Sequence, residues 1–316
     1  MQAYILRRLL ALVPTLFFAS VIVFVSVRLI PGSIIDLMLA QNPLAADKDR
    51  AAIEVALGLD KPMYVQYFHW AADALRGDLG RSLWQDRPVL EEVMARVPVT
   101  LELALLAMIV SIMVAIPIGV YSAIRQDTAG DYATRSFSIL MLAIPGFWLA
   151  TLVMVFPSIW WGWAPELTYT PFFKDPIANL RQMLLPSIIL GTSLSAVTMR
   201  LMRTTMLEVL RQDYIRTAWA KGLNERLVVV RHALRNALIP VVTLIGLEVA
   251  AVIGGAVILE QIFVIPGMGL LLIEAVSARD YPIISGIFLI VGAAVMLINL
   301  LVDMSYGVLD PKVRYR

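Results

Sequence analysis

The sequence predicts an all-α integral membrane protein with six transmembrane helices and a small helical external segment between the first two. The 316 residues are 59% hydrophobic and 16% charged, and the mean hydropathy is +0.79. Soluble globular proteins carry about 25% charged residues, so much of this chain's surface must face lipid. Six apolar runs approach or exceed the roughly 20 residues that cross a bilayer as a helix. They are too long and too uniformly apolar for alternating barrel strands.

The six predicted spans are 9–30, about 99–123, about 136–157, 183–202, 238–259 and about 283–303. The apolar run of the first span exceeds the roughly 7–15 residues of a signal-peptide core, and no small-residue cleavage site follows it. We therefore expect it to remain as an anchor. The fourth span is the weakest, because it carries several hydroxyl side chains.

The distribution of Lys and Arg predicts that both termini are cytoplasmic. Cations cluster before the first span, between the second and third, between the fourth and fifth, and after the sixth: Arg7, Arg8, Arg125, Arg135, Arg200, Arg203, Arg211, Arg216, Lys221, Arg226, Arg231, Arg235, Lys312, Arg314 and Arg316. The opposite side has only Lys174, Arg181 and Arg279 outside one long segment. That segment, 31–98, is therefore expected to be external.

The external segment shows helical apolar spacing and is expected to form a small helical cap. Its apolar positions are Ile53, Leu57, Tyr64, Tyr67, Phe68, Ala71 and Leu75. His69 lies among these aromatic residues, and we expect it to be packed. The predicted organisation is thus an amino-terminal end with the first span (1–30), the external segment (31–98) and a five-span core (99–316).

Composition excludes several kinds of site. The absence of cysteine excludes disulfides and thiolate chemistry, and two histidines far apart in sequence disfavour a histidine-rich metal site. The net charge of +2 is too small to suggest a nucleic-acid partner. We expect no catalytic, cofactor-binding or metal-binding residues in this chain.

The basic stretch between the fourth and fifth spans contains two amphipathic helical patterns that flank Gly222. The apolar positions are Leu207, Leu210, Tyr214 and Ala218 before the glycine, and Leu223, Leu227, Val230, Leu234 and Leu238 after it. Glycine terminates helices readily, so two short helices are expected to meet there at the membrane surface. The residues alone leave two interpretations: a basic hairpin held by anionic lipid, or a surface that docks a partner.

The string DYIRTAWAKGLNERLVVVRHALRNALIP resembles the EAA loop of ABC importer permeases, within the oligopeptide, dipeptide and nickel family and its dipeptide B-type subunit. Arg216, Thr217 and Ala218 occupy the E-A-A positions, and Gly222 is the glycine of the pattern. The segment 232–235 replaces the I-x-L-P positions, so the glutamate and proline of the general pattern are absent. Further strings in matching order cover nearly the whole chain, among them GDLGRSLWQDRPVLEEVMARVPVTLELALLA, IPGFWLA, IFVIPGMG, ARDYPII and DPKVRY.

This resemblance implies a type I ABC importer permease fold in a bacterial inner membrane. It implies a cytoplasmic coupling loop, 203–237, that seats in a partner ATPase. The residues expected to make that contact are Arg216, Thr217, Ala218, Lys221, Gly222, Leu223 and Arg226. The implied partners are a second homologous permease, two ABC ATPase subunits and a periplasmic substrate-binding protein, with membrane lipid around the spans. The external segment and the loop EQIFVIPGMG are expected to contact the binding protein or gate the outer mouth.

The chain is not expected to be an enzyme. It has no G-x-x-x-x-G-K-[ST] stretch, so ATP and Mg²⁺ would be bound by the partner ATPases. The implied cargo is a peptide, with nickel chelates, glutathione, opines or sugars as alternatives. A secondary transporter is disfavoured because no internal repeat is evident. An intramembrane hydrolase is disfavoured because Asp303 is an isolated carboxylate and no histidine lies within a span.

Glu248 lies near the middle of the fifth predicted span, where a carboxylate costs about 2.5–3.5 kcal/mol on insertion scales. Three interpretations remain open: hydrogen bonding in a helix interface, pairing with the second permease, or lining the path beside a cationic part of the substrate. Gly254 and Gly255 are also predicted to line the path, with close helix packing as the alternative.

Overall fold

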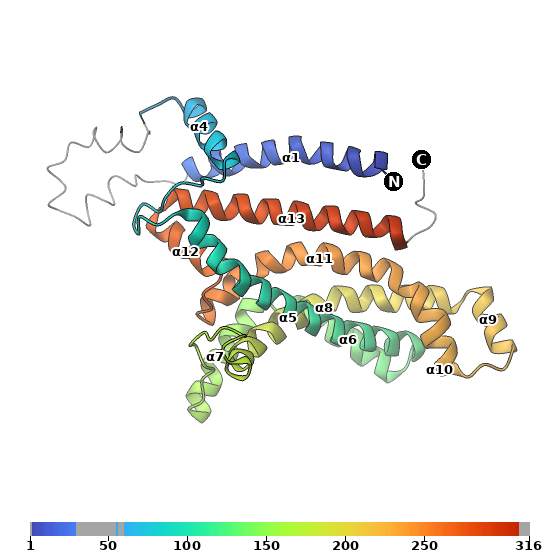
Figure 1. The fold of residues 1–316 in the computed structure, drawn as a ribbon. Coiled ribbons are helices and arrows are strands. Elements are labelled where there is room, and N and C mark those ends of the chain that lie inside the picture. The colour runs from blue at the N-terminus through green and yellow to red at the C-terminus, as the bar shows by residue number, and fades with distance from the viewer. Residues whose placement is uncertain (1, 30–54, 56–59, 310–316) are drawn as a thin grey trace. The chain divides into compact units, whose positions relative to one another are not determined.

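The computed structural model describes residues 2–29, 55 and 60–309. The described residues form helices joined by turns and loops, and the only β-pairing among them is one isolated bridge between Arg81 and Pro88. It divides into two compact units, one of residues 1–97 and 271–297 and the other of residues 98–270 and 298–316. Figure 1 labels the helices of both units.

Five long apolar helices overlap the first, second, fourth, fifth and sixth predicted spans. They are α1 (Gln2–Arg28), α5 (Val89–Ile124), α8 (Pro176–Leu210), α11 (Arg235–Ile262) and α13 (Tyr281–Leu309). The prediction of these five spans is confirmed. One further helix, α12 (Met268–Ala278), was not predicted, because its apolar stretch is too short to cross a bilayer.

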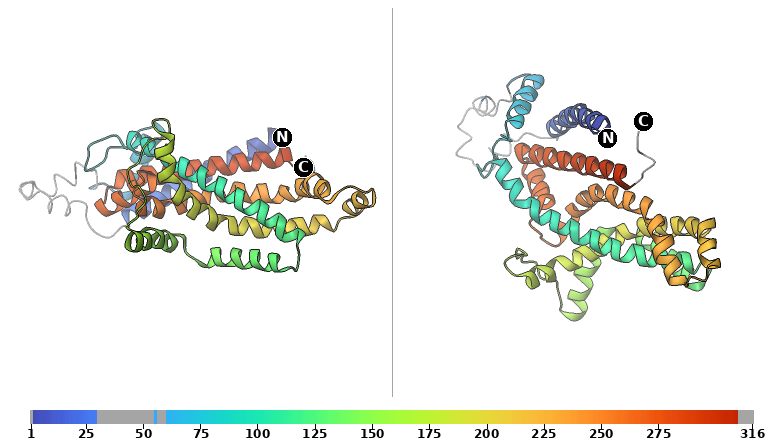
Figure 2. Two further views of the ribbon diagram at one scale, coloured as in Figure 1. Left: turned by 90° about the horizontal axis from the view of Figure 1, so that it is seen from below. Right: turned by 45° about the vertical axis from the view of Figure 1, so that its right-hand side comes forward.

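The third predicted span is broken into two helices. α6 (Ala129–Ala143) and α7 (Gly146–Trp161) meet at an angle of 90°, and Figure 2 (left) shows α6 lengthwise while α7 is turned nearly end-on. The break lies at Ile144–Pro145, where Ile144 leaves the helical conformation and Pro145 precedes the first residue of α7. Proline disfavours a helical conformation in the preceding residue. The third predicted span, about 136–157, is therefore a bent pair of helices and not one continuous helix.

In the first unit, α4 (Met63–Leu75) packs on α1 through Tyr67 and Trp70. The hydroxyls of Ser20 and Tyr67 are 2.9 Å apart, and the Phe24 ring lies against Tyr67 and Trp70. Leu75 is 90% exposed, and His69 is also exposed. The expectation of a packed histidine was therefore wrong, since the helix turns that residue away from its neighbour.

Two distant sequence strings meet in the first unit. Asp280, which precedes α13, accepts a hydrogen bond of 2.5 Å from Ser82 Oγ and one of 3.2 Å from the Leu83 backbone N–H. Trp84 Nε1 donates to the Ala278 carbonyl at 2.8 Å. The strings GDLGRSLWQDRPV and ARDYPII therefore form one hydrogen-bonded corner.

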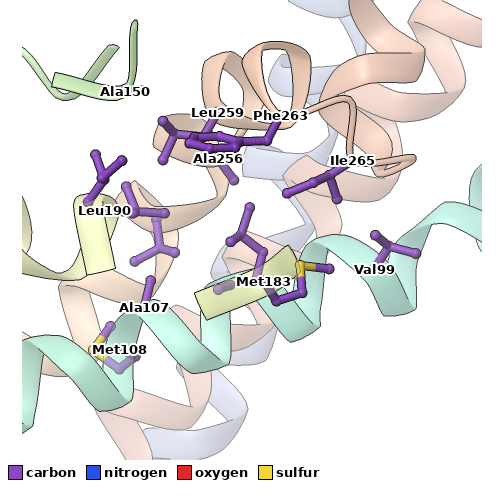
Figure 3. Close-up of a cluster of buried hydrophobic side chains, with 14 residues drawn as sticks. Val99, Ala107, Met108, Ala150, Met183, Leu190, Ala256, Leu259, Phe263 and Ile265 are labelled. Atoms are coloured by element: carbon purple, nitrogen blue, oxygen red, sulfur yellow. The ribbon is translucent and has the colours of Figure 1, made fainter. Parts of the chain in front are cut away.

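The core of the second unit lies where α5, α8 and α11 pack, with Ala150 added from α7. Figure 3 shows Met183, Leu190, Phe263 and Ile265 among its labelled side chains. Gly191 brings α8 very close to α5, because a Cβ there would stand 2.4 Å from the Ala107 carbonyl oxygen. Small residues permit this approach of membrane helices.

Candidate functional site

A short helix at one end of the second unit carries most of the predicted contact residues. α8 ends at Leu210, and after a two-residue turn α9 (Asp213–Ala220) begins. Figure 1 shows α9 and the following α10 (Glu225–Leu227) beyond the end of α6. The pattern predicted across Leu207–Ala218 is therefore divided between two helices, and the first of the two helices expected to meet at Gly222 has only eight residues.

One side of α9 is anchored in a buried cluster. Ile215 and Ala218 pack with Met202 and Met206 of α8 and with Ala233 and Ala237 from the segment that leads into α11. The side-chain amide of Asn236 also donates a 2.7 Å hydrogen bond to the Tyr214 hydroxyl. These contacts fix the orientation of a helix that would be too short to persist alone.

The other side of α9 and the turn after it are uncovered in the single chain. Arg216, Thr217, Lys221, Gly222 and Arg226 are exposed, and Trp219 beside them is 43% exposed. Ala218 is buried and Leu223 is half-buried. Five of the seven predicted contact residues are therefore exposed, and the other two, Ala218 and Leu223, pack against the rest of the chain.

Gly222 has the backbone geometry expected of a helix-ending glycine. Its φ is +77°, a left-handed conformation that side chains with a Cβ resist. Its N–H donates to the Trp219 carbonyl at 2.9 Å. Two residues later, the Asn224 side chain accepts a hydrogen bond from the Leu227 N–H at 2.8 Å and caps the next helix. The predicted bend at Gly222 is confirmed.

The helical face predicted after Gly222 was only partly right: Leu223, Leu234 and Leu238 pack against the buried cluster, whereas Leu227 and Val230 are exposed. A π-helical segment, Val228–Leu234, follows α10 and changes the register. The buried residues are Val228, Val229, Ala233, Ala237 and Val241, whereas Val230 of the predicted face is 55% exposed. A π-turn adds a residue to a helical turn, so a strict 3.6-residue count cannot follow the face through it.

A buried ion pair near this element was not predicted. Asp131 is fully buried, and both of its carboxylate oxygens accept hydrogen bonds from Arg203, at 2.9 Å from Nε and 2.7 Å from Nη2. Ser122 Oγ donates to the same carboxylate. The pair joins α5, α6 and α8. In the sequence Arg203 counts only as one more cytoplasmic cation, since no local pattern connects residues 72 positions apart.

Glu248 lies on α11 and is 8% exposed. The Thr198 hydroxyl of α8 lies 2.9 Å and 3.0 Å from its two carboxylate oxygens. This contact favours the first of the three interpretations, a hydrogen bond in a helix interface. Gly254 and Gly255 are exposed on the same helix, and only Gly255 has a close neighbour, since a Cβ added there would stand 3.1 Å from Leu190. Lining of the path by these residues stays a prediction.

The loop EQIFVIPGMG is built around a buried carboxylate. Glu260 is 0% exposed and accepts hydrogen bonds from the Gly269 N–H at 2.7 Å, the Leu270 N–H at 3.1 Å and Thr100 Oγ1 at 2.7 Å. The Thr100 oxygen accepts in turn from the Met268 N–H at 2.8 Å. Glu260 and Thr100 therefore satisfy the first N–H groups of α12. No local signal in the sequence indicates this role, because the two side chains are 160 residues apart.

The chain matches two family descriptions. Residues 115–315 match the binding-protein-dependent transport system inner membrane component, and residues 1–104 match the N-terminal part of the membrane component of such systems. A putative peptide transport system permease protein of Brucella abortus (strain 2308) is 40% identical over 315 residues, which cover 100% of both chains. The dipeptide transport system permease protein DppB of Escherichia coli (strain K12) is 38% identical over 339 aligned positions, again covering 100% of both.

A more distant similarity is to a crystal structure of an amino acid ABC transporter with histidines. The TM-score is 0.46 at 13% identity, over 71% of this chain and 94% of that one.

Proposed function

Because the chain belongs to the family of binding-protein-dependent transport system inner membrane components, we propose that it is the permease subunit of an ABC importer for peptides. It forms half of the translocation path, and a second homologous permease forms the other half. The peptide cargo is proposed from the full-length relatives, whose names are peptide and dipeptide transport permeases.

The observation that carries the proposal is the two-sided α9 element. Its inner side is locked onto α8 and the segment before α11, while its outer side presents exposed Arg216, Thr217 and Trp219. A displacement of the outer side of α9 would therefore move α8 and α11. A permease that is driven by a separate ATPase requires such a connection. We propose that two ATPase subunits, which bind ATP and Mg²⁺, dock here. A periplasmic binding protein would deliver the cargo at the opposite side of the bacterial inner membrane.

The test is reconstitution of the complete transporter with its partner subunits. We expect ATP-dependent uptake of peptides in the presence of the binding protein, and no ATP hydrolysis by this chain purified without ATPase subunits. Uptake driven by an ion gradient in the isolated chain would indicate a secondary transporter instead. Uptake of nickel chelates, glutathione, opines or sugars but not peptides would reassign the cargo and leave the role unchanged.

The proposed orientation gives a topology prediction. Asp60 and Glu225 are both exposed, and the chain has no cysteine, so single introduced cysteines report on one position each. An impermeant thiol reagent should label Asp60→Cys from outside intact cells and should label Glu225→Cys only after the membrane is opened. The reverse pattern would invert the orientation.

Glu248→Gln separates the interpretations of that carboxylate. The glutamine amide oxygen still accepts the Thr198 hydroxyl, so we expect intact assembly and less than about a twofold change in uptake for neutral and cationic peptides alike. Thr198→Val serves as the matched control that removes only the hydroxyl. A fall confined to cationic peptides would instead place Glu248 on the path.

A further inference from the structure

A groove in the second unit lies beside the amino-terminal part of α8 and does not include α9. It has a volume of about 420 Å³ and is lined by the segment Trp163–Glu166 on one side and by Arg181, Leu184, Leu185 and Ile188 of α8 on the other. This volume falls in the range of sites for small organic ligands, about 300–1,000 Å³. The groove is thus large enough for a ligand of a few residues.

The segment that forms one wall is held in place by hydrogen bonds from its neighbours. The fully buried Asn179 of α8 donates to the Thr170 carbonyl at 2.9 Å, and the Tyr169 hydroxyl donates to Glu102 of α5 at 3.1 Å. Burial and the nearby Glu102 carboxylate raise the pKa of Tyr169 to about 12, so this hydroxyl keeps its proton and remains a donor. The wall that carries Trp163 and Glu166 is therefore attached to α5 and α8.

The groove contains one charge of each sign, and neither is used by the protein. Among the described residues, neither Arg181 nor Glu166 forms a salt bridge or a hydrogen bond through its side chain. Between them lie apolar side chains, with Leu184 51% exposed and Trp163 52% exposed. The chemistry that complements this lining is a small zwitterion with a separate anion and cation and an apolar body.

We propose that this groove binds a short peptide by its two free ends, with Arg181 holding the carboxylate and Glu166 the ammonium group. The guanidinium fork matches the geometry of a carboxylate, and the leucine side chains and Trp163 accept an apolar peptide side chain. The inference rests on the proposed function, and it adds a recognition site within the permease to the specificity supplied by a binding protein.

A phospholipid is the competing occupant, and two observations disfavour it. Glu166 would repel the phosphate of any anionic lipid that approached Arg181. The apolar wall on α8 extends only from Arg181 to Ile188, about 10 Å of helix, which suits one or two amino-acid side chains better than two acyl chains.

The test uses a cysteine introduced into the groove of the assembled transporter in nanodiscs. The chain has no cysteine of its own, so labelling read on this chain's band reports on this groove alone in Leu184→Cys, and Ile188→Cys provides a second reporter. We expect alanyl-leucine to slow labelling by a maleimide, and the neutral N-acetyl-alanyl-leucine amide to leave it unchanged. Arg181→Gln should weaken this protection by roughly tenfold in concentration, as expected for one charge-assisted hydrogen bond.

Arg200→Gln is the matched control, because Arg200 is an exposed cation on the same helix that does not line the groove. A lack of protection by the free dipeptide would overturn the inference. Uptake of the same dipeptide by the same transporter reconstituted in liposomes shows that the proposed function survives that failure, and absence of uptake shows that both fail. Labelling slowed by phosphatidylethanolamine nanodiscs without peptide, and restored by Arg181→Gln, would assign the groove to lipid and overturn the peptide site.

Discussion

Gly222→Val is expected to uncouple the permease from the proposed ATPase subunits while leaving the membrane helices folded. Gly222 has a φ of +77°, and no atom lies within 4 Å of the Cβ that a substitution would add. The cost is therefore in the backbone and not in packing. A left-handed conformation costs an ordinary residue roughly 1–2 kcal/mol, and a β-branched residue more. The turn should open and move the exposed face of α9.

The measurement is the amount of ATPase that copurifies with the permease, together with peptide uptake. We expect both to fall by about tenfold, the factor that corresponds to 1.4 kcal/mol. Gly222→Asn is the matched control, since asparagine tolerates the left-handed region and should retain most of the coupling. Normal copurification and normal uptake in the valine variant would show that the bend is not needed.

Glu260→Ala is expected to destabilise the second unit more than any change on its surface. The variant leaves the N–H groups of Gly269 and Leu270 and the Thr100 hydroxyl without their buried acceptor. Each buried donor left without an acceptor costs about 1–3 kcal/mol. The melting temperature of the purified transporter should fall by roughly 10 °C.

Glu208→Ala removes an exposed carboxylate from α8 and should change the melting temperature by less than about 1 °C. Gly269→Ala tests the same hydrogen bonds from the donor residue. The new Cβ would stand 2.4 Å from the Val257 Cα and 2.9 Å from Glu260 Oε2. Equal melting temperatures for Glu260→Ala and Glu208→Ala would refute a structural role for the buried carboxylate. In that case, any role of the loop EQIFVIPGMG in gating the outer mouth would depend only on its exposed residues.

The turn between α9 and α10 could be predicted from the sequence, but its internal packing could not. The bend was predictable because glycine is a local signal for the end of a helix, and Gly222 acts as that signal implies. The face predicted for the following helix was only partly right, because the π-helical segment Val228–Leu234 breaks the count of 3.6 residues per turn. Ala218 was expected to contact the ATPase, whereas its side chain is buried.

The sequence by itself determined the membrane class, five of the spans and the position of the basic loop, because each depends on composition within one continuous window. The tertiary structure alone decided the 90° break at Pro145 and the pairing of Asp131 with Arg203. It also decided the burial of Glu260 against Thr100. In a membrane helix nearly every face is apolar, so periodicity does not say which side meets protein and which meets lipid. Polar partners many residues apart have no common window, and only the folded chain brings them within hydrogen-bonding distance.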